Sequence, residues 1–252
     1  HIIGHGAVAV VDPGPLGGDP QHVAELIRLL DGEKVVAILC THTHRDHSPA
    51  ALPLAQATGA AVIGCAPLVL ADDGPRADAS FDDTYTPDQV LGDGDAVSGP
   101  GWTLRALATP GHTSNHLCFA LEEEQALFTG DHVMGWSTSV VSPPDGDMAA
   151  YMDSLALLQT REDARYYPAQ GGPVDKPQRL VRGMFVHRRQ REGQILAQLA
   201  SGPQSIKAMV PIMYKGIDPR LYPAAGRSVL AHLIDLRAKA RVQVEGVVWS
   251  LV

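Results

Sequence analysis

The chain has 252 residues, of which 45% are hydrophobic, and a formal net charge of −8. This length allows one large domain, or one large and one small domain, with a substantial hydrophobic core. No run approaches the roughly 18 apolar residues that are needed to span a membrane, and no basic start followed by an apolar stretch indicates a signal peptide. We therefore expect a soluble protein with no membrane partner.

The first predicted elements are a strand over 6–11 and a helix over 20–30. The strand is apolar and closes in a Pro- and Gly-rich turn that begins at Asp12. We interpret Asp12 as a turn residue, or as a carboxylate that supports metal ligands, and not as a ligand itself. The helix is predicted because apolar residues recur there at helical spacing and Gly32 follows as a stop.

The densest group of candidate ligands follows a short apolar run that predicts a buried strand. Residues 41–47 read T-H-T-H-R-D-H, which places His42, His44, Asp46 and His47 within six residues. Imidazole nitrogens and carboxylate oxygens are the ligands that zinc accepts. A strand that ends and opens into a loop can direct all four side chains at one point, so this segment predicts a metal site.

After this loop we expect a helix over 49–58, a strand over 60–64, and a loop over 72–88. The loop is acidic and poor in large apolar residues. It either covers the mouth of the active site or is an ordinary solvated loop.

Two later strands also end at candidate ligands. A strand predicted over 103–108 leads into Pro-Gly-His-Thr, which contains His112, and a strand over 126–129 leads into Gly-Asp, which contains Asp131. The strand between them, over 117–121, is joined to the last one by an acidic turn. His116 is interpreted as a supporting or structural residue, with contact to substrate as the alternative.

A long connection follows Asp131 and precedes a helix predicted over 148–158. It contains Trp136, Ser137 and Thr138 directly after the candidate ligand, so these residues are candidates for substrate contact. Asp147 is expected to cap the helix, because an aspartate accepts hydrogen bonds from the free N–H groups of a first turn.

Taken together, T-H-x-H-x-D-H, P-G-H-T and G-D, in this order and spacing, resemble the metallo-β-lactamase superfamily over residues 5–178. The resemblance implies an α/β fold, a four-layer αβ/βα sandwich with metals at one edge between two sheets. The first eleven residues resemble the middle of the family's N-terminal hairpin, which leaves open whether a leader or a first strand precedes His1.

The resemblance also implies roles for individual residues. His42, His44 and His112 match the three-histidine site, Asp46 and His47 match ligands of the second site, and Asp131 matches the bridging carboxylate. The family's last ligand is a histidine, and Gln170 stands at its position. An amide oxygen is a poor zinc ligand beside an imidazole, so we expect one tight Zn²⁺ site and a second site that is weaker or altered, with Gln170 a doubtful ligand.

The last part of the chain has a different character. Helices predicted over 180–199, 204–210 and 224–239, with Pro211 ending the second, precede a hairpin over 241–249. This order resembles the winged-helix appendage of one branch of the superfamily, which includes an endoribonuclease, and in that branch the appendage helps wall the active-site cleft. We place a catalytic domain at 1–178 and a winged-helix-like domain at 179–252.

Charge is divided unevenly between these two parts. Residues 1–178 hold 8 Lys and Arg against 24 Asp and Glu, a net charge of −16, whereas residues 179–252 hold 12 against 4, a net charge of +8. Such asymmetry suggests two functional surfaces. The acidic part favours neutral or cationic substrates, or substrates whose charge lies on the far side.

The three cysteines, Cys40, Cys65 and Cys118, are far apart and lie in apolar contexts. We interpret them as packed free thiols, which fits a reducing compartment and a cytoplasmic location.

A zinc ion lowers the pKa of a bound water to near 7 and so supplies hydroxide at neutral pH. Asp46 would orient that hydroxide and accept its proton if one metal binds, and would act mainly as a ligand if two bind. The first hypothesis is therefore a zinc-dependent hydrolase of a small ester, thioester, lactone or lactam.

Two further hypotheses stay open. A metal-dependent endoribonuclease is supported by the basic C-terminal part, with a possible nucleic-acid surface on Arg182, Arg188, Arg189 and Arg227, because arginines neutralise phosphates. The same arginines could instead form a solvated helix face or a dimer contact. A binding protein with degenerate catalysis is supported by Gln170. The sequence leaves the substrate and the oligomeric state open.

Overall fold

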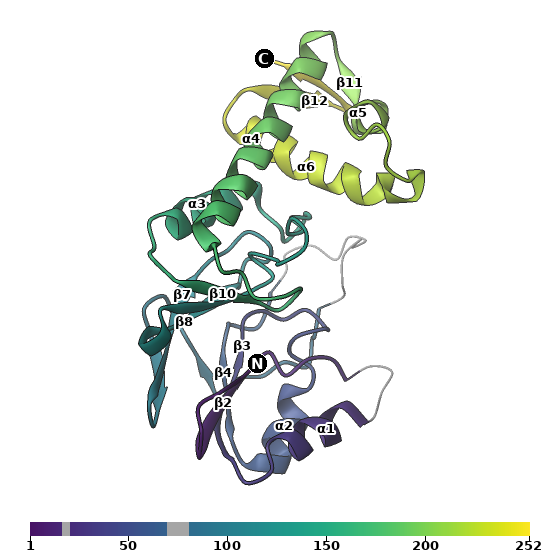
Figure 1. Ribbon diagram of the computed structural model, residues 1–252. Helices are drawn as coiled ribbons and strands as arrows, with labels where there is room; N and C mark the ends of the chain where they lie inside the picture. The colour runs from purple at the N-terminus through teal and green to yellow at the C-terminus, as the bar shows by residue number, and fades with distance from the viewer. Residues whose placement is uncertain (17–20, 70–80) are drawn as a thin grey trace.

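The computed structural model describes residues 1–16, 21–69 and 81–252. Two five-stranded sheets face each other, and helices cover both outer faces (Figure 1). The first sheet has the order β1-β2-β3-β4-β5, formed by Ile2–Ile3, Ala7–Val11, Lys34–Cys40, Ala61–Gly64 and Gln89–Val90. The second has the order β10-β9-β8-β7-β6, formed by Arg165–Pro168, Ala126–Gly130, Leu117–Leu121, Trp102–Ala108 and Ala96–Gly99.

The strand directions bring several strand ends to one edge of the molecule. In the second sheet β7, β8 and β9 pair antiparallel, and β10 pairs parallel to β9. The carboxyl ends of β7, β9 and β10 therefore point the same way. In the first sheet β2, β3, β4 and β5 run parallel, and the Leu117 N–H of β8 donates to the Thr41 carbonyl directly after β3 at 2.8 Å.

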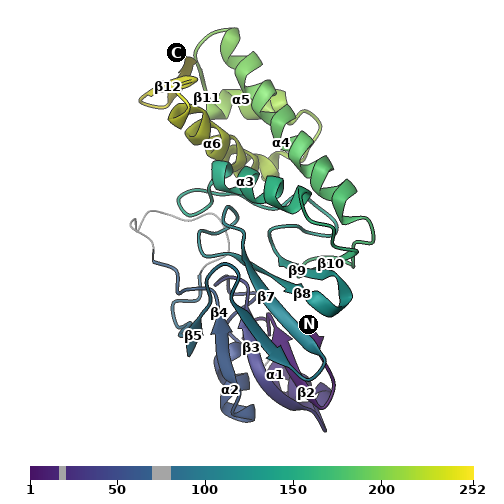
Figure 2. The same cartoon turned by 90° about the vertical axis from the view of Figure 1, so that its left-hand side faces the viewer.

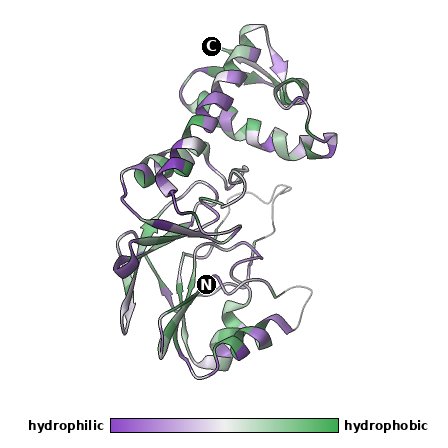
Figure 3. Ribbon diagram, in the orientation of Figure 1, coloured by the Kyte–Doolittle hydropathy of each residue, from purple (hydrophilic) through white to green (hydrophobic). Residues whose placement is uncertain are grey.

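Strands β8 and β9 of the second sheet are buried on both faces, which explains their nearly continuous apolar sequences. Successive side chains of a strand point to opposite faces. Phe119 of β8 accordingly packs into the core between the two sheets, whereas its neighbour Cys118 packs into the core beneath the outer helices. Hydrophobic residues dominate the strands, while hydrophilic residues recur along the outer helices (Figure 3).

Four helices complete the layers. The first sheet is covered by α1 (Gln21–Leu29) and α2 (Ala51–Thr58), and the second by α3 (Met148–Gln159) and the first half of α4 (Pro177–Ala200) (Figure 1). A 3₁₀ turn, η1 (Glu122–Glu124), joins β8 to β9. The predicted four-layer α/β sandwich is confirmed.

A second, smaller unit of helices and strands lies at the end of the molecule away from α1 and α2 (Figure 2). Its sheet has the order β11-β13-β12, and with the second half of α4 its elements form the predicted winged helix. They are β11 (Gln204–Ser205), α5 (Ile206–Met213), η2 (Pro219–Leu221), α6 (Tyr222–Ala238), β12 (Val242–Glu245) and β13 (Val248–Leu251).

Helix α4 links the two units. Its 24 residues give it a length of about 36 Å. Val181 and Met184 pack into the core beneath α3, while Ile195 and Leu199 pack into the separate core of the winged helix. One continuous helix therefore sets the distance and rotation between the two units.

Two sequence-based expectations about local structure were wrong. Pro211 lies inside α5 instead of ending it, because Met209 and Val210 are buried and anchor the helix across that point. Phe81 and Tyr85 are buried, although a solvated loop was expected there, because Tyr85 packs into the core between the sheets and Phe81 lies 4.8 Å from the His44 ring. Residues 72–80 of that loop lie outside the described part of the chain.

The three cysteines are buried and free, as expected. Over the described ranges, no helix has both the length and the apolar character required to cross a bilayer.

The predicted cap of α3 gives a test of local stability. Asp147 accepts a hydrogen bond from the Ala150 N–H at 2.9 Å, and its own N–H donates to the Gly111 carbonyl at 3.0 Å. We expect Asp147→Ala to lower the free energy of unfolding by about 1 kcal/mol, because a first-turn N–H loses its acceptor. Urea denaturation of this variant beside Asp153→Ala, an exposed position within the same helix, measures the effect. Equal losses in the two variants would contradict a capping role.

Candidate metal centre

Four strand ends bring the predicted ligands to one place. The loop after β3 carries His42, His44, Asp46 and His47. His112 follows β7, Asp131 follows β9 at once, and Gln170 follows β10. Strands from both sheets therefore contribute to a single cluster at the edge where their carboxyl ends meet.

Three imidazole nitrogens converge in this cluster. His42 Nε2 lies 3.1 Å from His44 Nδ1, and His112 Nε2 lies 3.0 Å from the same His44 atom. Tetrahedral zinc, with nitrogens at 2.0–2.1 Å, would separate such ligands by about 3.3 Å. The three side chains are buried and are spaced as ligands of one metal ion would be.

The hydrogen-bond partners of Nδ1 in His42 and His112 determine that Nε2 of each ring carries the lone pair. His112 Nδ1 lies 2.6 Å from the Val140 carbonyl, which only accepts, so Nδ1 donates and Nε2 carries the lone pair. The Thr41 hydroxyl donates to Asp12 at 2.8 Å, so it accepts from His42 Nδ1 at 3.0 Å. Both Nε2 atoms thereby face the centre of the cluster as acceptors.

A second group of ligands adjoins the first. His47 Nδ1 donates to Asp12 at 3.0 Å. Its Nε2 lies 3.4 Å from Asp46 Oδ2 and 3.5 Å from Asp131 Oδ1, while Asp131 Oδ2 lies 3.8 Å from His112 Nε2. The two oxygens of Asp131 thus face different groups, which is the placement of a bridging carboxylate.

The electrostatics keep most ligands in the form that binds a cation. Burial, and then the neighbouring His112, lower the pKa of His44 to about 3, and burial and the surrounding histidines hold the pKa of His42 well below its ordinary value. The hydrogen bond from His47 lowers the pKa of Asp46 to about 2. Burial acts to lower the pKa of His47, but the carboxylates of Asp12, Asp131 and Asp46 together raise it well above normal.

Several buried polar atoms of the cluster have no partner in the protein, among them His47 Nε2 and Asp131 Oδ1. Buried polar groups are ordinarily satisfied. Buried atoms without a hydrogen bond beside three converging imidazole nitrogens are the environment that a divalent cation satisfies, so the residues present fit a metal.

Gln170 reaches the same place as the other candidates. Its amide Nε2 donates to Asp46 Oδ2 at 2.9 Å, so in this arrangement its nitrogen, and not its oxygen, faces the ligand group. The side chain therefore fixes the orientation of Asp46.

His116 lies behind the cluster and not in the space open to substrate. It is 1% exposed, and its Nε2 accepts from the Asp131 N–H at 3.2 Å while Nδ1 lies 2.9 Å from the Thr109 hydroxyl. Both nitrogens are engaged, so the alternative of substrate contact does not match its position, and the structural interpretation does.

A cleft of about 650 Å³ opens over the cluster. His44, Asp46, His112 and Asp131 belong to its wall, and the remainder of the wall comes from the connection after Asp131 and from the winged helix. The lining residues are Thr138, Ser139, Val140, Val141, Ser142, His187, Arg188, Arg191, Tyr214, Ile217, Leu221, Ala224, Ala225, Arg227 and Ser228.

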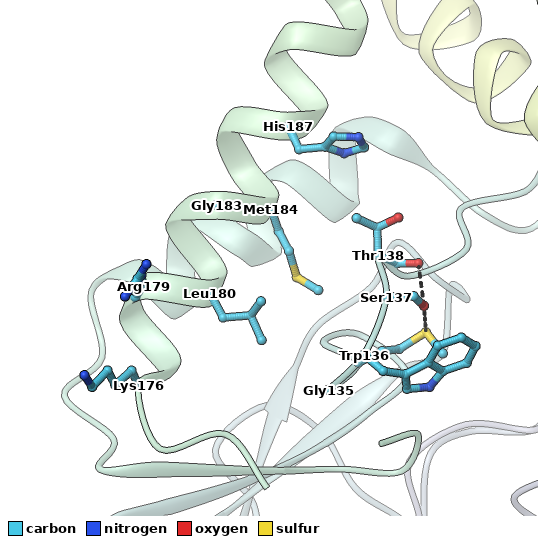
Figure 4. Close-up of a pocket in the computed structure, with 11 residues that line it drawn as sticks. Gly135, Trp136, Ser137, Thr138, Lys176, Arg179, Leu180, Gly183, Met184 and His187 are labelled. Carbon is cyan, nitrogen blue, oxygen red and sulfur yellow. Dashed lines mark hydrogen bonds between the residues drawn. The ribbon is translucent and has the colours of Figure 1, made fainter. Parts of the chain in front are cut away.

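A second hollow adjoins this cleft and shares Thr138 and His187 with it. Trp136 and Ser137 lie on one side of this hollow, and Leu180 and Met184 of α4 on the other (Figure 4). Of the three candidates for substrate contact, Thr138 therefore lines the metal cleft, whereas Trp136 and Ser137 line the adjoining hollow.

The proposed basic stripe for nucleic acid does not form a single surface. Arg188 is 4% exposed and faces the cleft, while Arg182 and Arg189 are exposed on α4. Sequence reasoning placed Arg188 on a surface and missed Arg191 and Tyr214 as cleft residues. The several arginines of α4 could have indicated a functional surface, but the packing of α4 determines which of them face the cleft.

The chain matches two family models. Residues 2–170 match the model described as the metallo-beta-lactamase superfamily, and residues 205–249 match the beta-lactamase associated winged helix domain.

Individual proteins show the same resemblance. The chain is 28% identical to the lactamase-like protein adaB of Aspergillus niger, over 98% of this chain and 77% of that protein. It is 31% identical to an atrochrysone carboxyl ACP thioesterase of Cryptosporiopsis sp., over 86% of this chain and 62% of that protein. A solved beta-lactamase domain protein from Burkholderia ambifaria has the same fold, with a TM-score of 0.81 and 23% identity over 98% of this chain and 82% of that one.

The backbone before Asp131 gives a test of how the cluster is built. Gly130 has φ +47°, and a Cβ on it would lie 2.6 Å from Thr41 Oγ1 and 2.7 Å from His116 Nε2. We expect Gly130→Ala to weaken metal affinity by about tenfold, since supporting groups of a metal site are worth about 10- to 100-fold in affinity. Competition with a chelator of known affinity measures this loss. Gly6→Ala, at φ +73° with nothing within 4 Å, is the control, and an equal loss there would mean that backbone strain alone is responsible.

Gln170 provides a second test. We expect Gln170→His to raise the occupancy of a second metal to about one per chain, because an imidazole beside Asp46 and His47 is a better ligand for zinc than an amide. Metal titration by calorimetry, with Gln190→His on the exposed face of α4 as control, measures the stoichiometry. An unchanged stoichiometry would contradict the assignment of Gln170 to the second site.

Proposed function

Because the chain belongs to the metallo-β-lactamase superfamily and is a hydrolase of the branch with a winged helix, we propose that it is a divalent-metal-dependent thioesterase. The main support is the convergence of three imidazole nitrogens beside a cleft with polar and apolar lining residues. His42 Nε2 and His112 Nε2 lie 3.1 Å and 3.0 Å from His44 Nδ1. The thioesterase name of a relative that is 31% identical over 86% of this chain favours a thioester among the candidate substrates.

We assign His42, His44 and His112 to a first metal, with zinc the ion that their nitrogens favour. Asp46, His47 and Asp131 would hold a second, weaker ion, with Asp131 bridging the two. A bound divalent ion supplies Lewis acidity and lowers the pKa of a coordinated water toward neutrality.

The protein's own residues do the rest of the work in this proposal. Asp46 is the most open of the carboxylates, with 44% of its side chain exposed. Its lowered pKa keeps it a carboxylate at neutral pH, so with only the first metal bound it can accept a proton from an attacking water. The Gln170 amide donates to Asp46 Oδ2 at 2.9 Å and so orients the carboxylate.

The surroundings of the cluster accommodate the two halves of a thioester. Apolar side chains in the cleft, including Val140, Ile217 and Leu221, suit an acyl chain. The adjoining hollow meets the cleft at Thr138 and His187, and its Trp136 and Met184 suit the arm of a leaving thiol. A thiol leaves as a stable thiolate, so no strong proton donor is required on that side.

The alternative of a ribonuclease has less support. The arginines that line the cleft share one pocket with the metal ligands, while Arg182 and Arg189 lie outside it, and the part of the chain that holds the ligands carries a net charge of −16. Such a charge opposes the approach of a polyanion.

The proposal is tested with metal-loaded protein and four substrates: an acyl N-acetylcysteamine thioester, a lactone, a penicillin and an unstructured RNA. We expect the thioester to give the highest kcat/KM, and His44→Ala to lower this value at least about 100-fold, since even the groups that support metal ligands contribute 10- to 100-fold. His5→Ala, whose side chain is 99% exposed, is the control and should retain activity.

Hydrolysis of RNA in preference to the thioester would replace this proposal by the nuclease. Activity that survives in His44→Ala would remove the three-histidine site from the mechanism.

A further inference from the structure

The part of the cleft wall that comes from the winged helix carries three arginines. Arg188 and Arg191 extend from α4, and Arg227 extends from α6. We call these three residues the arginine wall. They share one cleft with the candidate metal ligands, so a molecule bound at the metal site also meets the arginine wall.

Arg188 is buried with few partners. It is 4% exposed and lines the cleft, and within the described ranges its guanidinium contacts the Ser139 carbonyl, the Ser228 hydroxyl at 3.4 Å and the ring of Tyr151 at 5.2 Å. Its Nε has no hydrogen-bond partner. A guanidinium has five N–H groups to donate, so neutral acceptors satisfy only part of this charge.

Arg191 is bound in a similar way. It lies 4.1 Å over the Tyr214 ring and donates to Gln194 at 2.8 Å and to the Met213 carbonyl at 3.1 Å. Arg227 donates to the Pro143 carbonyl at 2.8 Å. The contacts of Arg191 hold its side chain in place, and they involve neutral groups.

Three of the four acids of the C-terminal part pair with basic residues outside the cleft, and the fourth, Glu245, is exposed on β12. The pairs are Glu192 with Arg189 at 3.4 Å, Asp218 with Arg220 at 2.6 Å and Asp235 with Lys239 at 2.7 Å. Within the described residues, no carboxylate lies within 4 Å of the Arg188 or Arg191 nitrogens, and Asp46 and Asp131 of the metal site are the acids that line the cleft. A buried charge without a counter-charge is costly, so an anionic group of a bound ligand would stabilise Arg188.

We propose that the arginine wall binds a carboxylate at the far end of the substrate's acyl chain, so that the enzyme selects thioesters of dicarboxylic acids. This inference rests on the proposed thioesterase function. The scissile carbonyl would lie at the metal cluster, the chain against Val140 and Ile217, and the distal carboxylate on the planar donors of arginine, which match it in a bidentate manner. An anionic oxygen could also come from a phosphate on the thiol, and the test separates the two sources.

The first measurement is binding of product-like acids to the metal-loaded protein by calorimetry. Succinate, glutarate and adipate are each compared with their monomethyl esters, which keep one carboxylate for the metal and lose the distal charge. We expect at least one diacid to bind about tenfold or more tightly than its ester, since hydrogen bonds to a charged group exceed neutral ones by about that factor. Arg188→Met should abolish this ratio and Arg188→Lys should retain part of it.

The second measurement is hydrolysis of the same acyl groups as thioesters of N-acetylcysteamine and of coenzyme A. We expect the preference for the free carboxylate over its methyl ester, in kcat/KM, to be similar for both thiols and to fall in Arg188→Met. Arg182→Met, exposed on the same helix, is the control and should keep the wild-type ratio. A structural role of Arg188 would lower the rates for both acyl groups and leave their ratio unchanged.

The results distinguish a failure of the proposed thioesterase function from a failure of the proposed role of the arginine wall. If wild-type protein hydrolyses no thioester, the proposed function fails, while the binding ratio still decides the role of the arginine wall. Equal binding of acid and ester by wild-type protein, a ratio that survives in Arg188→Met, or a preference that follows the coenzyme A phosphates instead of the acyl charge would each overturn the inference. If Arg188→Met does not fold, Arg191→Met takes its place with the same expectation.

Discussion

The structure depends on one electrostatic constraint: imidazole nitrogens from two different sheets are held about 3 Å apart. The orientations of His42 and His112 are fixed by the Asp12–Thr41 hydrogen bonds on one side and the Val140 carbonyl on the other. Without a cation, a neutral His44 can donate from Nδ1 to only one of the two facing Nε2 atoms, so one acceptor stays unsatisfied. Because the ligands belong to the loops that follow β3 and β7, metal affinity and the packing of the two sheets are thermodynamically linked.

The positions of the candidate ligands are encoded locally, whereas the four layers were implied by the resemblance of three motifs to a known superfamily. Ligands follow apolar strands at once, as at Cys40 and Gly130, and parallel strands bring such ends to one edge. The helix cap at Asp147 is equally local. What failed depends on tertiary packing: the burial of Tyr85, the passage of α5 through Pro211, and the inward direction of Arg188 each follow from neighbours that are distant in sequence.

The net charge of the N-terminal part and the charges that line the cleft give different information about the substrate. The acidic N-terminal part suggested neutral or cationic substrates, or substrates whose charge lies on the far side, and the cleft receives its side chains from both parts of the chain. Many of the acids lie on exposed surfaces such as η1, where solvent screens them. Arg188 faces the cleft and is 4% exposed, and a charge acts more strongly in such an environment. A long polyanion meets the net charge of the whole domain, whereas a small ligand meets only the charges that line the cleft.

The continuity of α4 has a consequence for how such an enzyme could diversify. Val181 and Met184 of this helix pack beneath α3, and its Ile195 and Leu199 pack into the core of the winged helix. Each residue of a helix adds about 1.5 Å and a rotation of about 100°. A single insertion between those anchors would turn Ile195 and Leu199 around the helix axis, so the winged helix would have to give up the packing of Ala231 of α6 beneath α3 and would present different side chains to the cleft. A change in the rotation of α4 would thus alter which side chains line the cleft, and with them the substrates that it accepts, while every metal ligand stays in place.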